Sequence, residues 1–415
     1  MTVRRRILLS AYACEPDRGS EPGVGWNQAR QAARFNEVWV LTRSNNAGPI
    51  RKELSRNPLP NAHWCYYDLP RWLSFWKKRQ RGVHLYYYLW QIGAYFLAKR
   101  LHTKIGFDLV HHVTFVNYWM PSLLALLPVP FIWGPVGGAE SMPRPFWRGS
   151  GERGKTYEML RLLARWRGEH DLLVRVTAKR ACIALATTPE TAQRLARLGC
   201  RDVRLLGESG ISEKEIAELP EHPPRVGPVR FVSVGRLLGW KGYHLSLPAF
   251  AKARASLPAS SYWFIGDGPA RKSLVQLAQR LNVAESVQFW GALPRSLVLK
   301  KLLDCDIFVH PSLHDSGGWV CLEAMAVGRP VICLDHGGPA VQVTSETGIK
   351  VPAESPGQVI ESLTQAMLRL AENPRLRREL SIAARRRVQS VFAWDKRGEV
   401  LERLYRDATG QAASA

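Results

Sequence analysis

Two acids, a pair of glycines and an apolar stretch occur together in residues 310–330, which read HPSLHDSGGWVCLEAMAVGRP. A buried strand is expected to end at His310, a loop carries Asp315, and the helix that follows carries Glu323. Backbone N–H groups at the start of a helix can bind phosphate or sugar oxygens, and carboxylates accept hydrogen bonds from hydroxyls. Either acid alone would also fit a solvated position or the first turn of a helix. The combination favours a site for a sugar or a ribose.

Two cations lie close together in residues 235–242, GRLLGWKG, which follow another apolar run. Arg236 and Lys241 are five positions apart on a loop that leaves an expected parallel strand. Arg binds a diphosphate through its fork of N–H donors, and Lys binds it as a point charge. The segment therefore fits a diphosphate site, and a solvated loop is the alternative.

A third cluster, GSEPGVGW at residues 19–26, follows the first apolar run of the chain. Gly23 and Gly25 would let the backbone approach a phosphate or a sugar ring at the start of a helix. A plain turn between a strand and a helix also favours glycine. The third glycine of a dinucleotide-binding loop is missing, and so is a ribose-binding acid on a following strand, which argues against a dinucleotide site.

Residues 149–156, GSGERGKT, match the phosphate-loop pattern G-x4-G-K-T. That loop needs a hydrophobic strand directly before it, and the preceding residues PRPFWR do not form one. We interpret the match as chance.

Short apolar runs that alternate with amphipathic, Arg-rich stretches must position these clusters. The first series of expected strands is RRILLSAYA, EVWVLTR, DLVHHVTF, PFIWGPV and ACIALATT, and the second is VRFVSVG, YWFIGDG, SVQFWG, DIFVHPS and RPVICLD. Strands alternating with helices form parallel sheets, so two series predict two doubly wound α/β domains. We place the domains in residues 1–206 and 229–390, a polar, Pro-rich linker in 207–228, and a C-terminal helix in 391–415 that could cross back to the first domain.

The composition excludes several classes of protein. The chain has 415 residues, 46% hydrophobic and 22% charged, which rules out a disordered or coiled-coil protein. The formal net charge of +23 favours polyanions, anionic lipid surfaces or phosphorylated substrates as partners. Seven cysteines without a C-x-x-C pair argue against a disulfide framework or a zinc site and fit a reduced cytosolic compartment. No window reaches the roughly 18 apolar residues of a spanning helix, so any membrane contact is expected to be peripheral.

Residues 71–104 and 141–180 carry much of the positive charge. The first segment has eight Lys or Arg, no acid and nine aromatic residues, and the second has ten basic and four acidic residues. Aromatic rings mixed with cations suit the interface of an anionic membrane, and Lys77, Lys78 and Arg79 are candidate contacts. In the alternative interpretation, residues 86–101 form a core-packing helix and the charges are its solvated face.

The order of these motifs resembles that of a known enzyme family. Residues 310–330, with acids at 315 and 323, are similar to the E-x7-E region of family four of the retaining glycosyltransferases. The segments GRLLGWKG at 235–242, GDGP at 266–269 and TGIKVP at 347–352 and the early glycine loop resemble that family in the same order. The resemblance implies the GT-B architecture, with two doubly wound Rossmann-like domains that face across a cleft. The first domain would bind the acceptor and the second the nucleotide sugar.

The resemblance implies roles for the residues of the donor site. Arg236 and Lys241 would neutralise the donor diphosphate, and Gly23 and Gly25 would lie near it. Backbone N–H groups of Ser316, Gly317 and Gly318 would bind the sugar or the phosphate. Fixed cations at a leaving diphosphate lower the barrier to its departure. No metal and no further cofactor are then expected, and no D-x-D motif is placed to bind a metal.

Further residues are implied around the sugar and the nucleotide. Asp315 would contact hydroxyls of the donor sugar, and Glu323 would hold the ribose of the nucleotide. Gly266 and Asp267 are the other candidates for nucleotide binding. The usual first acid of the family is Glu followed by Gly-Phe-Gly, whereas Asp315 is followed by Ser-Gly-Gly, which leaves the identity of the sugar open.

Members of the family commonly carry an active-site histidine on a strand of the first domain. The corresponding segment DLVHHV, residues 108–113, places His111 and His112 on opposite faces of its strand. Both are catalytic candidates, together with Asp315 and Glu323. One should reach the cleft, with His111 favoured, and the other should be a hydrogen-bonded core residue.

The expected function is a retaining glycosyltransferase that moves a sugar from a nucleotide-diphosphate sugar to a saccharide or lipid-linked acceptor, in surface polysaccharide or glycolipid synthesis. We expect it in the cytoplasm or on the cytoplasmic face of the membrane, in peripheral contact with anionic lipid. A nucleotide-sugar epimerase of the same architecture is the alternative. A nucleic-acid-binding protein would explain the charge, but no helix-turn-helix, RNA-recognition or zinc pattern occurs, so no nucleic-acid partner is expected.

Overall fold

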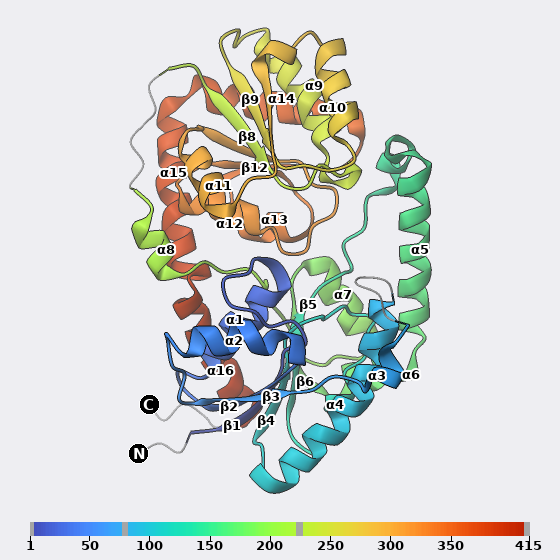
Figure 1. The fold of residues 1–415 in the computed structure, drawn as a ribbon. Coiled ribbons are helices and arrows are strands. Elements are labelled where there is room, and N and C mark those ends of the chain that lie inside the picture. Colours follow the sequence, from blue (N-terminus) through green and yellow to red (C-terminus); the bar gives the residue numbers. More distant parts are fainter. Residues whose placement is uncertain (1–3, 77–81, 221–226, 411–415) are drawn as a thin grey trace. The chain divides into compact units, whose positions relative to one another are not determined.

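The chain divides into two compact units, each with its own parallel sheet (Figure 1). The computed structural model describes residues 4–76, 82–220 and 227–410. Unit 1 comprises the described parts of Met1–Ala139, Leu162–Glu208 and Trp394–Ala415, and unit 2 those of Glu140–Arg161 and Ser209–Ala393. Residues 140–161, which the sequence placed in the first domain, thus group with unit 2 by their contacts.

Unit 1 is built on a seven-stranded parallel sheet with the order β3-β2-β1-β4-β5-β6-β7. The strands are β1 (Arg6–Ser10), β2 (Glu37–Thr42), β3 (Ala62–Tyr66), β4 (Leu109–His112), β5 (Phe131–Val136), β6 (Ala181–Ala186) and β7 (Val203–Leu205). The central strands are buried along almost their whole length, as expected for a parallel sheet with both faces covered. The strand order reverses between β1 and β4, and the loops after these strands meet at a topological switch point.

The helices of unit 1 follow from the polar and amphipathic stretches between the strands. They are α1 (Ser20–Ala32), α2 (Ala47–Leu54), α3 (Arg71–Ser74), α4 (Val83–Ile105), α6 (Leu172–Arg180), α7 (Pro189–Leu198) and α16 (Trp394–Ala408), with short 3-10 helices η1 (Ser44–Asn46) and η2 (Leu123–Leu126). Local sequence sets their ends. The Thr188 side chain caps α7, Pro189 occupies its first position, and Gly199 ends it in the left-handed conformation.

Helix α16 joins unit 1 through side chains from both ends of the chain. The Arg5 guanidinium lies 2.9 Å from a carboxylate oxygen of Glu402. Asn36 donates to the other oxygen of Glu402 at 2.9 Å, and Gln31 of α1 donates to Asp395 at 2.8 Å. The last described helix is therefore a structural part of the N-terminal sheet domain.

Unit 2 contains a six-stranded parallel sheet with the order β10-β9-β8-β11-β12-β13. The strands are β8 (Arg230–Val234), β9 (Ser261–Ile265), β10 (Val287–Gly291), β11 (Ile307–His310), β12 (Val331–Leu334) and β13 (Gly348–Val351). Two separate apolar clusters pack in this unit, and strands such as β8 and β11 contribute residues to both. The order reverses between β8 and β11, which places a second switch point at their carboxyl ends.

Helices surround the second sheet. They are α8 (Glu213–Glu218), α9 (Tyr243–Arg254), α10 (Arg271–Arg280), α11 (Arg295–Leu303), α12 (Trp319–Ala326), α13 (Gly337–Gln342), α14 (Pro356–Glu372) and α15 (Pro374–Arg387), with 3-10 helices η3 (Arg144–Ser150), η4 (Gly239–Lys241) and η5 (Ala284–Ser286) and a π-helical turn η6 (Val388–Phe392). Helix α5 (Gly151–Glu169) contributes residues to both units.

All ten strands expected from apolar runs are present, and three further strands, β3, β7 and β13, were not expected. The expected linker 207–228 contains helix α8, which a capping box of Ser212 and Glu215 begins. Helix η3, rather than a strand, precedes the residues that match a phosphate loop. Within the residues described, no helix is both long and apolar enough to cross a membrane.

Candidate functional site

Asp315 is the centre of a polar cluster on the loop after β11. Its Oδ2 atom lies 2.5 Å from Nζ of Lys241 and 3.1 Å from Nε2 of His310, and its Oδ1 accepts the N–H of Gly318 at 3.1 Å. Burial alone would raise the pKa of this carboxyl, but the Lys241 charge and the hydrogen bonds from His310 and Lys241 hold it well below its usual range. Asp315 is therefore an ionised acceptor inside the unit.

Lys241 reaches Asp315 because the loops after β8 and β11 are bound to each other at the switch point. The N–H of Leu313 donates to the carbonyl of Trp240 at 2.8 Å. Gly242 has a φ of +73°, and a Cβ there would collide with the carbonyl of Pro311. A glycine is required at this position for both reasons.

Helix α13 forms hydrogen bonds with the loop that carries Ser316, Gly317 and Gly318. The Gly338 N–H donates to the Asp315 carbonyl at 2.8 Å. The carbonyl of Gly317 accepts hydrogen bonds from the side chains of Ser209 and Gln342. Gly318 has a φ of +56° and begins α12, so the free N–H groups of this helix start beside Asp315. The structure thus brings Lys241, Asp315 and the 316–318 loop together.

Glu323 lies one turn into α12 and is almost completely buried. Its Oε1 is 2.6 Å from Nε of Arg295 at the start of α11, and Arg295 also pairs with Glu215 of α8. Burial raises the pKa of Glu323, and the Arg295 charge opposes that rise. Arg295 was missed from the sequence, because nothing in the motif around residue 323 points to a cation 28 positions earlier.

Arg236 is exposed, and the structure gives its guanidinium no ion-pair partner among the described residues. Its loop lies against the loop after β9, because the Leu237 N–H donates to the Asp267 carbonyl at 3.0 Å. A Cβ on Gly266 would collide with the carbonyl of Gly235. The Asp267 carboxylate is exposed and stays 3.9 Å from Arg271. The candidates for the diphosphate and the nucleotide therefore lie on adjacent loops of unit 2.

The glycines of the first cluster lie inside α1 and are buried. A Cβ on Gly23 would collide with the Arg18 carbonyl, and a Cβ on Gly25 with the carbonyl of Ala13. Glu21 accepts the Phe115 N–H from the segment after β4. Close packing of α1 against the loop that precedes it is a sufficient reason for both glycines.

His111 and His112 are both fully buried, and their hydrogen bonds differ. The Nε2 atom of His111 lies 2.7 Å from the carbonyl of Gly134, so that it donates, and Nδ1 lies 2.9 Å from the Tyr405 hydroxyl. Burial lowers the pKa of His111 to about 3. Both ring nitrogens of His111 are thus used inside the domain, where the sequence had favoured this residue for the cleft.

His112 keeps one ring nitrogen free. Its Nε2 atom is 2.8 Å from the Tyr87 hydroxyl and 3.1 Å from the carbonyl of Thr114, whereas Nδ1 has no partner within the described part of the chain. Burial lowers the pKa of His112 to about 4. Of the two histidines, His112 is thus the one with a ring nitrogen that has no hydrogen-bond partner in the described part of the chain.

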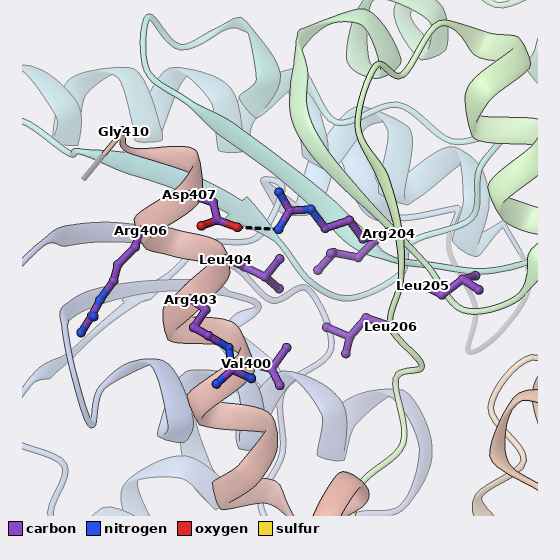
Figure 2. A pocket seen from close by; sticks show the side chains of 10 residues that line it. Arg204, Leu205, Leu206, Val400, Arg403, Leu404, Arg406, Asp407 and Gly410 are labelled. Atoms are coloured by element: carbon purple, nitrogen blue, oxygen red, sulfur yellow. Dashed lines mark hydrogen bonds and ion pairs between the residues drawn. The ribbon is translucent and has the colours of Figure 1, made fainter. Parts of the chain in front are cut away.

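A cavity of about 690 Å³ lies in unit 1 against α16 (Figure 2). Leu185 of β6, the segment 204–206 and six residues between 400 and 410 line it, and the Arg204 and Asp407 side chains pair at 2.5 Å on its wall. None of the residues predicted for the site lines this cavity. In the described ranges, no group of three or more His, Cys, Asp or Glu side chains is placed to hold a metal ion.

The two doubly wound units define the GT-B fold. Sucrose-phosphate synthase from Thermosynechococcus elongatus superposes with a TM-score of 0.64 over 99% of this chain and 100% of that chain, at 20% identity. HepE from Anabaena, solved in complex with UDP and glucose, superposes with a TM-score of 0.58 over 97% of this chain and 100% of that one, at 15% identity.

Sequence comparison relates the second half of the chain to known glycosyltransferases. Residues 215–387 match the model of the family described as glycosyl transferases group 1. The lipopolysaccharide core biosynthesis glycosyltransferase LpsE of Rhizobium meliloti is 34% identical over 163 residues, which are 38% of this chain and 45% of LpsE. The chain spans less than half the length of the curated relatives that it matches first.

Proposed function

We propose that the protein is a glycosyltransferase that moves a sugar from a nucleotide-diphosphate sugar to a saccharide or lipid-linked acceptor. One observation carries the proposal: Lys241, an ionised Asp315 and the start of α12 meet at the switch point of unit 2. Ligands of open α/β sheets bind at such points. The family of residues 215–387 and the UDP and glucose bound to HepE support a nucleotide-sugar donor.

The charges of unit 2 suit the departure of a nucleoside diphosphate. Lys241 and the exposed Arg236 supply two cations on one loop, and the N–H groups at the start of α12 add a partial positive charge. Such fixed charges stabilise the negative charge that develops on the leaving group. We assign the neutralisation of the diphosphate to these groups and not to a metal ion.

The carboxylates would read the hydroxyls of the donor. Asp315 is ionised and accepts hydrogen bonds only, so it would hold hydroxyls of the sugar beside the 316–318 loop. Glu323 would accept hydrogen bonds from the hydroxyls of the ribose, and Arg295 would keep the Glu323 carboxylate oriented. Gly266 and Asp267, on the loop beside Arg236, would lie along the nucleotide.

Unit 1 would bind the acceptor, with His112 as the side chain that contacts the substrates. Transfer with retention requires the acceptor oxygen to attack the anomeric carbon on the face that the phosphate leaves. The new C–O bond forms as the bond to the phosphate oxygen breaks, and the acceptor proton passes to the departing phosphate. An acceptor carried by a lipid would place the enzyme on the cytoplasmic face of a membrane, where surface polysaccharides and glycolipids begin.

The donor assignment is tested by thermal unfolding with a panel of nucleoside diphosphates and their sugars. A ligand that binds only the folded state raises Tm. We expect one diphosphate to raise the Tm of the wild type. Arg236→Ala should increase the Kd for that diphosphate on the order of tenfold without changing the Tm of the free protein. The matched control is Arg280→Ala, an exposed arginine of α10. No shift with any diphosphate would overturn the proposal.

Turnover is tested with the donor identified in that panel. Glu323→Ala and His112→Ala should each lower the release of nucleotide in the presence of acceptor by roughly 10²-fold or more. Release of nucleotide from the donor alone, at the same rate as with acceptor, would instead identify an epimerase or a hydrolase. Near-normal turnover of Glu323→Ala would refute the assignment of the nucleotide site.

A further inference from the structure

Helix α5 buries polar side chains and exposes apolar ones, which is the reverse of a helix that packs on a hydrophobic core. In the part of α5 that belongs to unit 1, Arg165 points inward and is 4% exposed, whereas Leu163 and Trp166 point outward and are 59% and 60% exposed. The buried side also includes Gly168, at a helical spacing of three from Arg165. An apolar face toward water on one side of a helix is typical of an interaction surface.

The inward side of α5 is held by specific polar contacts, so the reversal is built into the sequence. Arg165 donates to the Gly138 carbonyl at 2.5 Å, and its guanidinium lies 5.6 Å from the centre of the Trp119 ring. A Cβ on Gly168 would collide with the backbone of Trp119. Turning α5 to bury its leucines would break these contacts. The apolar side chains therefore remain exposed in the free protein.

Neighbouring helices extend the same apolar surface. Leu172 and Val176 are exposed one turn apart on α6, and Leu85 and Ile92 are exposed on α4. Tyr88, which lies on α4 between the last two, donates to the Asp171 side chain that caps α6 at 3.2 Å. The exposed stripe of α4 thus begins beside the start of α6. Twelve of the sixteen exposed large apolar side chains among the described residues lie between residues 72 and 176.

The charges that face outward around this surface are positive. Between residues 159 and 180 the chain has six Lys or Arg and two acids, and four of the cations, Arg167, Arg175, Lys179 and Arg180, are exposed. Glu169 accepts from Tyr118 and pairs with Arg194, and Asp171 caps α6, so both acids are engaged. Exposed cations including Arg167 and Lys179 flank the apolar side chains. A surface of this kind is complementary to a layer that is negatively charged outside and apolar beneath.

We propose that α5, α6 and the outward stripe of α4 insert their apolar side chains into the headgroup region of an anionic bilayer. Trp166 and the leucines enter the apolar boundary, and the flanking cations meet lipid phosphates. The inference rests on the proposed function only in assigning a lipid-linked acceptor to this membrane. It differs from contact through charge alone, because insertion of apolar area persists when salt screens the charges. Lys77, Lys78 and Arg79 lie outside the described residues and take no part in the argument.

The test uses the full chain and sedimentation with phosphatidylcholine vesicles, with and without phosphatidylglycerol. We expect binding to the anionic vesicles and a loss on the order of tenfold or more in the double variant Leu163→Ser, Trp166→Ser. The control carries the same change at two exposed apolar residues of unit 2, Leu297→Ser and Ile382→Ser, and should bind as the wild type does. Wild-type binding by the double variant would overturn the proposal, as would binding that high salt abolishes completely.

Self-association is measured on the same samples by sedimentation equilibrium without lipid. If the wild type is a dimer, the double variant is a monomer and neither binds vesicles, the surface contacts a second copy of the chain and the membrane proposal is wrong. The response of Tm to the nucleoside diphosphate should be equal in the wild type and the double variant, because the changed side chains lie outside the donor loops. Vesicle binding without any response of Tm to nucleotides would contradict the proposed function but not the proposed membrane surface.

Discussion

The ammonium of Lys241 and the carboxylate of Asp315 lie 2.5 Å apart and join the loops after the two central strands of unit 2. Both side chains are mostly withdrawn from water. A buried pair depends on both partners, because either charge alone would be left unpaired. The pair therefore sets the conformation of the proposed donor site and the response of unit 2 to acid.

Replacement of Lys241 by methionine should destabilise the protein. The change leaves a buried carboxylate with one fewer partner, and we expect the free energy of unfolding at pH 7 to fall by about 3 kcal/mol. Urea denaturation measures this change. Lys252→Met removes an ammonium that pairs with Glu361 on the surface and should cause little change. Equal losses in the two variants would contradict a special role for the buried pair.

Asp315 should make stability depend on pH in the acid range. Its folded-state pKa lies below the ordinary value of 3.8, so its ionisation stabilises the fold above that pH and the contribution is lost as the pH falls through the folded pKa. Asp315→Asn should flatten the decline of the unfolding free energy below about pH 4. The decline is followed by urea denaturation at successive pH values, and an unchanged slope in the variant would be inconsistent with the depressed pKa.

His111 should make unit 1 sensitive to milder acid. Burial lowers its pKa from 6.5 to about 3, so stability is complete above pH 6.5 and declines as the pH falls below that value. His111→Asn should be less stable at pH 7 by about 2 kcal/mol, because the Tyr405 hydroxyl and the Gly134 carbonyl lose their partners. It should also show a shallower decline between neutral pH and pH 5 than the wild type.

Variants of Gly25 and Gly19 test whether packing requires a glycine at these positions. Gly25→Ala would place a methyl group against the Ala13 carbonyl and should cost roughly 1–3 kcal/mol of unfolding free energy. Gly19→Ala meets no atom within 4 Å and should stay within about 0.5 kcal/mol of the wild type. Thermal or urea unfolding without ligand measures both. A loss at Gly25 as small as that at Gly19 would show that packing does not require the glycine.

Arg295 should act on the donor through Glu323. In Arg295→Ala, burial is no longer opposed by a cation, so the pKa of Glu323 should rise further and its carboxyl should protonate more readily. The KM for the donor should increase on the order of tenfold, and more at low pH than at high pH. Arg295→Lys should recover part of the loss. The control Arg375→Ala removes a surface partner of Glu379 and should leave KM unchanged at every pH.

The ten short apolar runs were sufficient to predict the strands that they form, and their alternation with helices predicted the two parallel sheets. Strands β3 and β7 were missed because they are edge strands whose residues are only partly buried, so no continuous apolar run marks them. The motif around residue 315 predicted which loop bears the acid. It did not reveal His310 as a partner of Asp315, because that contact depends on where the side chains point.

Contacts between distant segments account for the other differences. Arg295 pairs with Glu323 only because α11 and α12 pack together in three dimensions. Packing alone requires Gly23 and Gly25, because a Cβ on either would strike a carbonyl of the preceding loop, and their place near the diphosphate stays a prediction. The choice between His111 and His112 depended on Tyr405, which lies 294 positions after His111. Local patterns could not include these distant partners.

Helix α16 gives the molecule an order of assembly during synthesis on the ribosome. Unit 1 receives its last described helix only after all of the sheet of unit 2 has been made. Until then Arg5 and Asn36 lack their partner Glu402, and His111 lacks the Tyr405 hydroxyl. Domains generally fold as units while the chain emerges. The C-terminal sheet domain can therefore mature first, and the domain that contains the N-terminus finishes last.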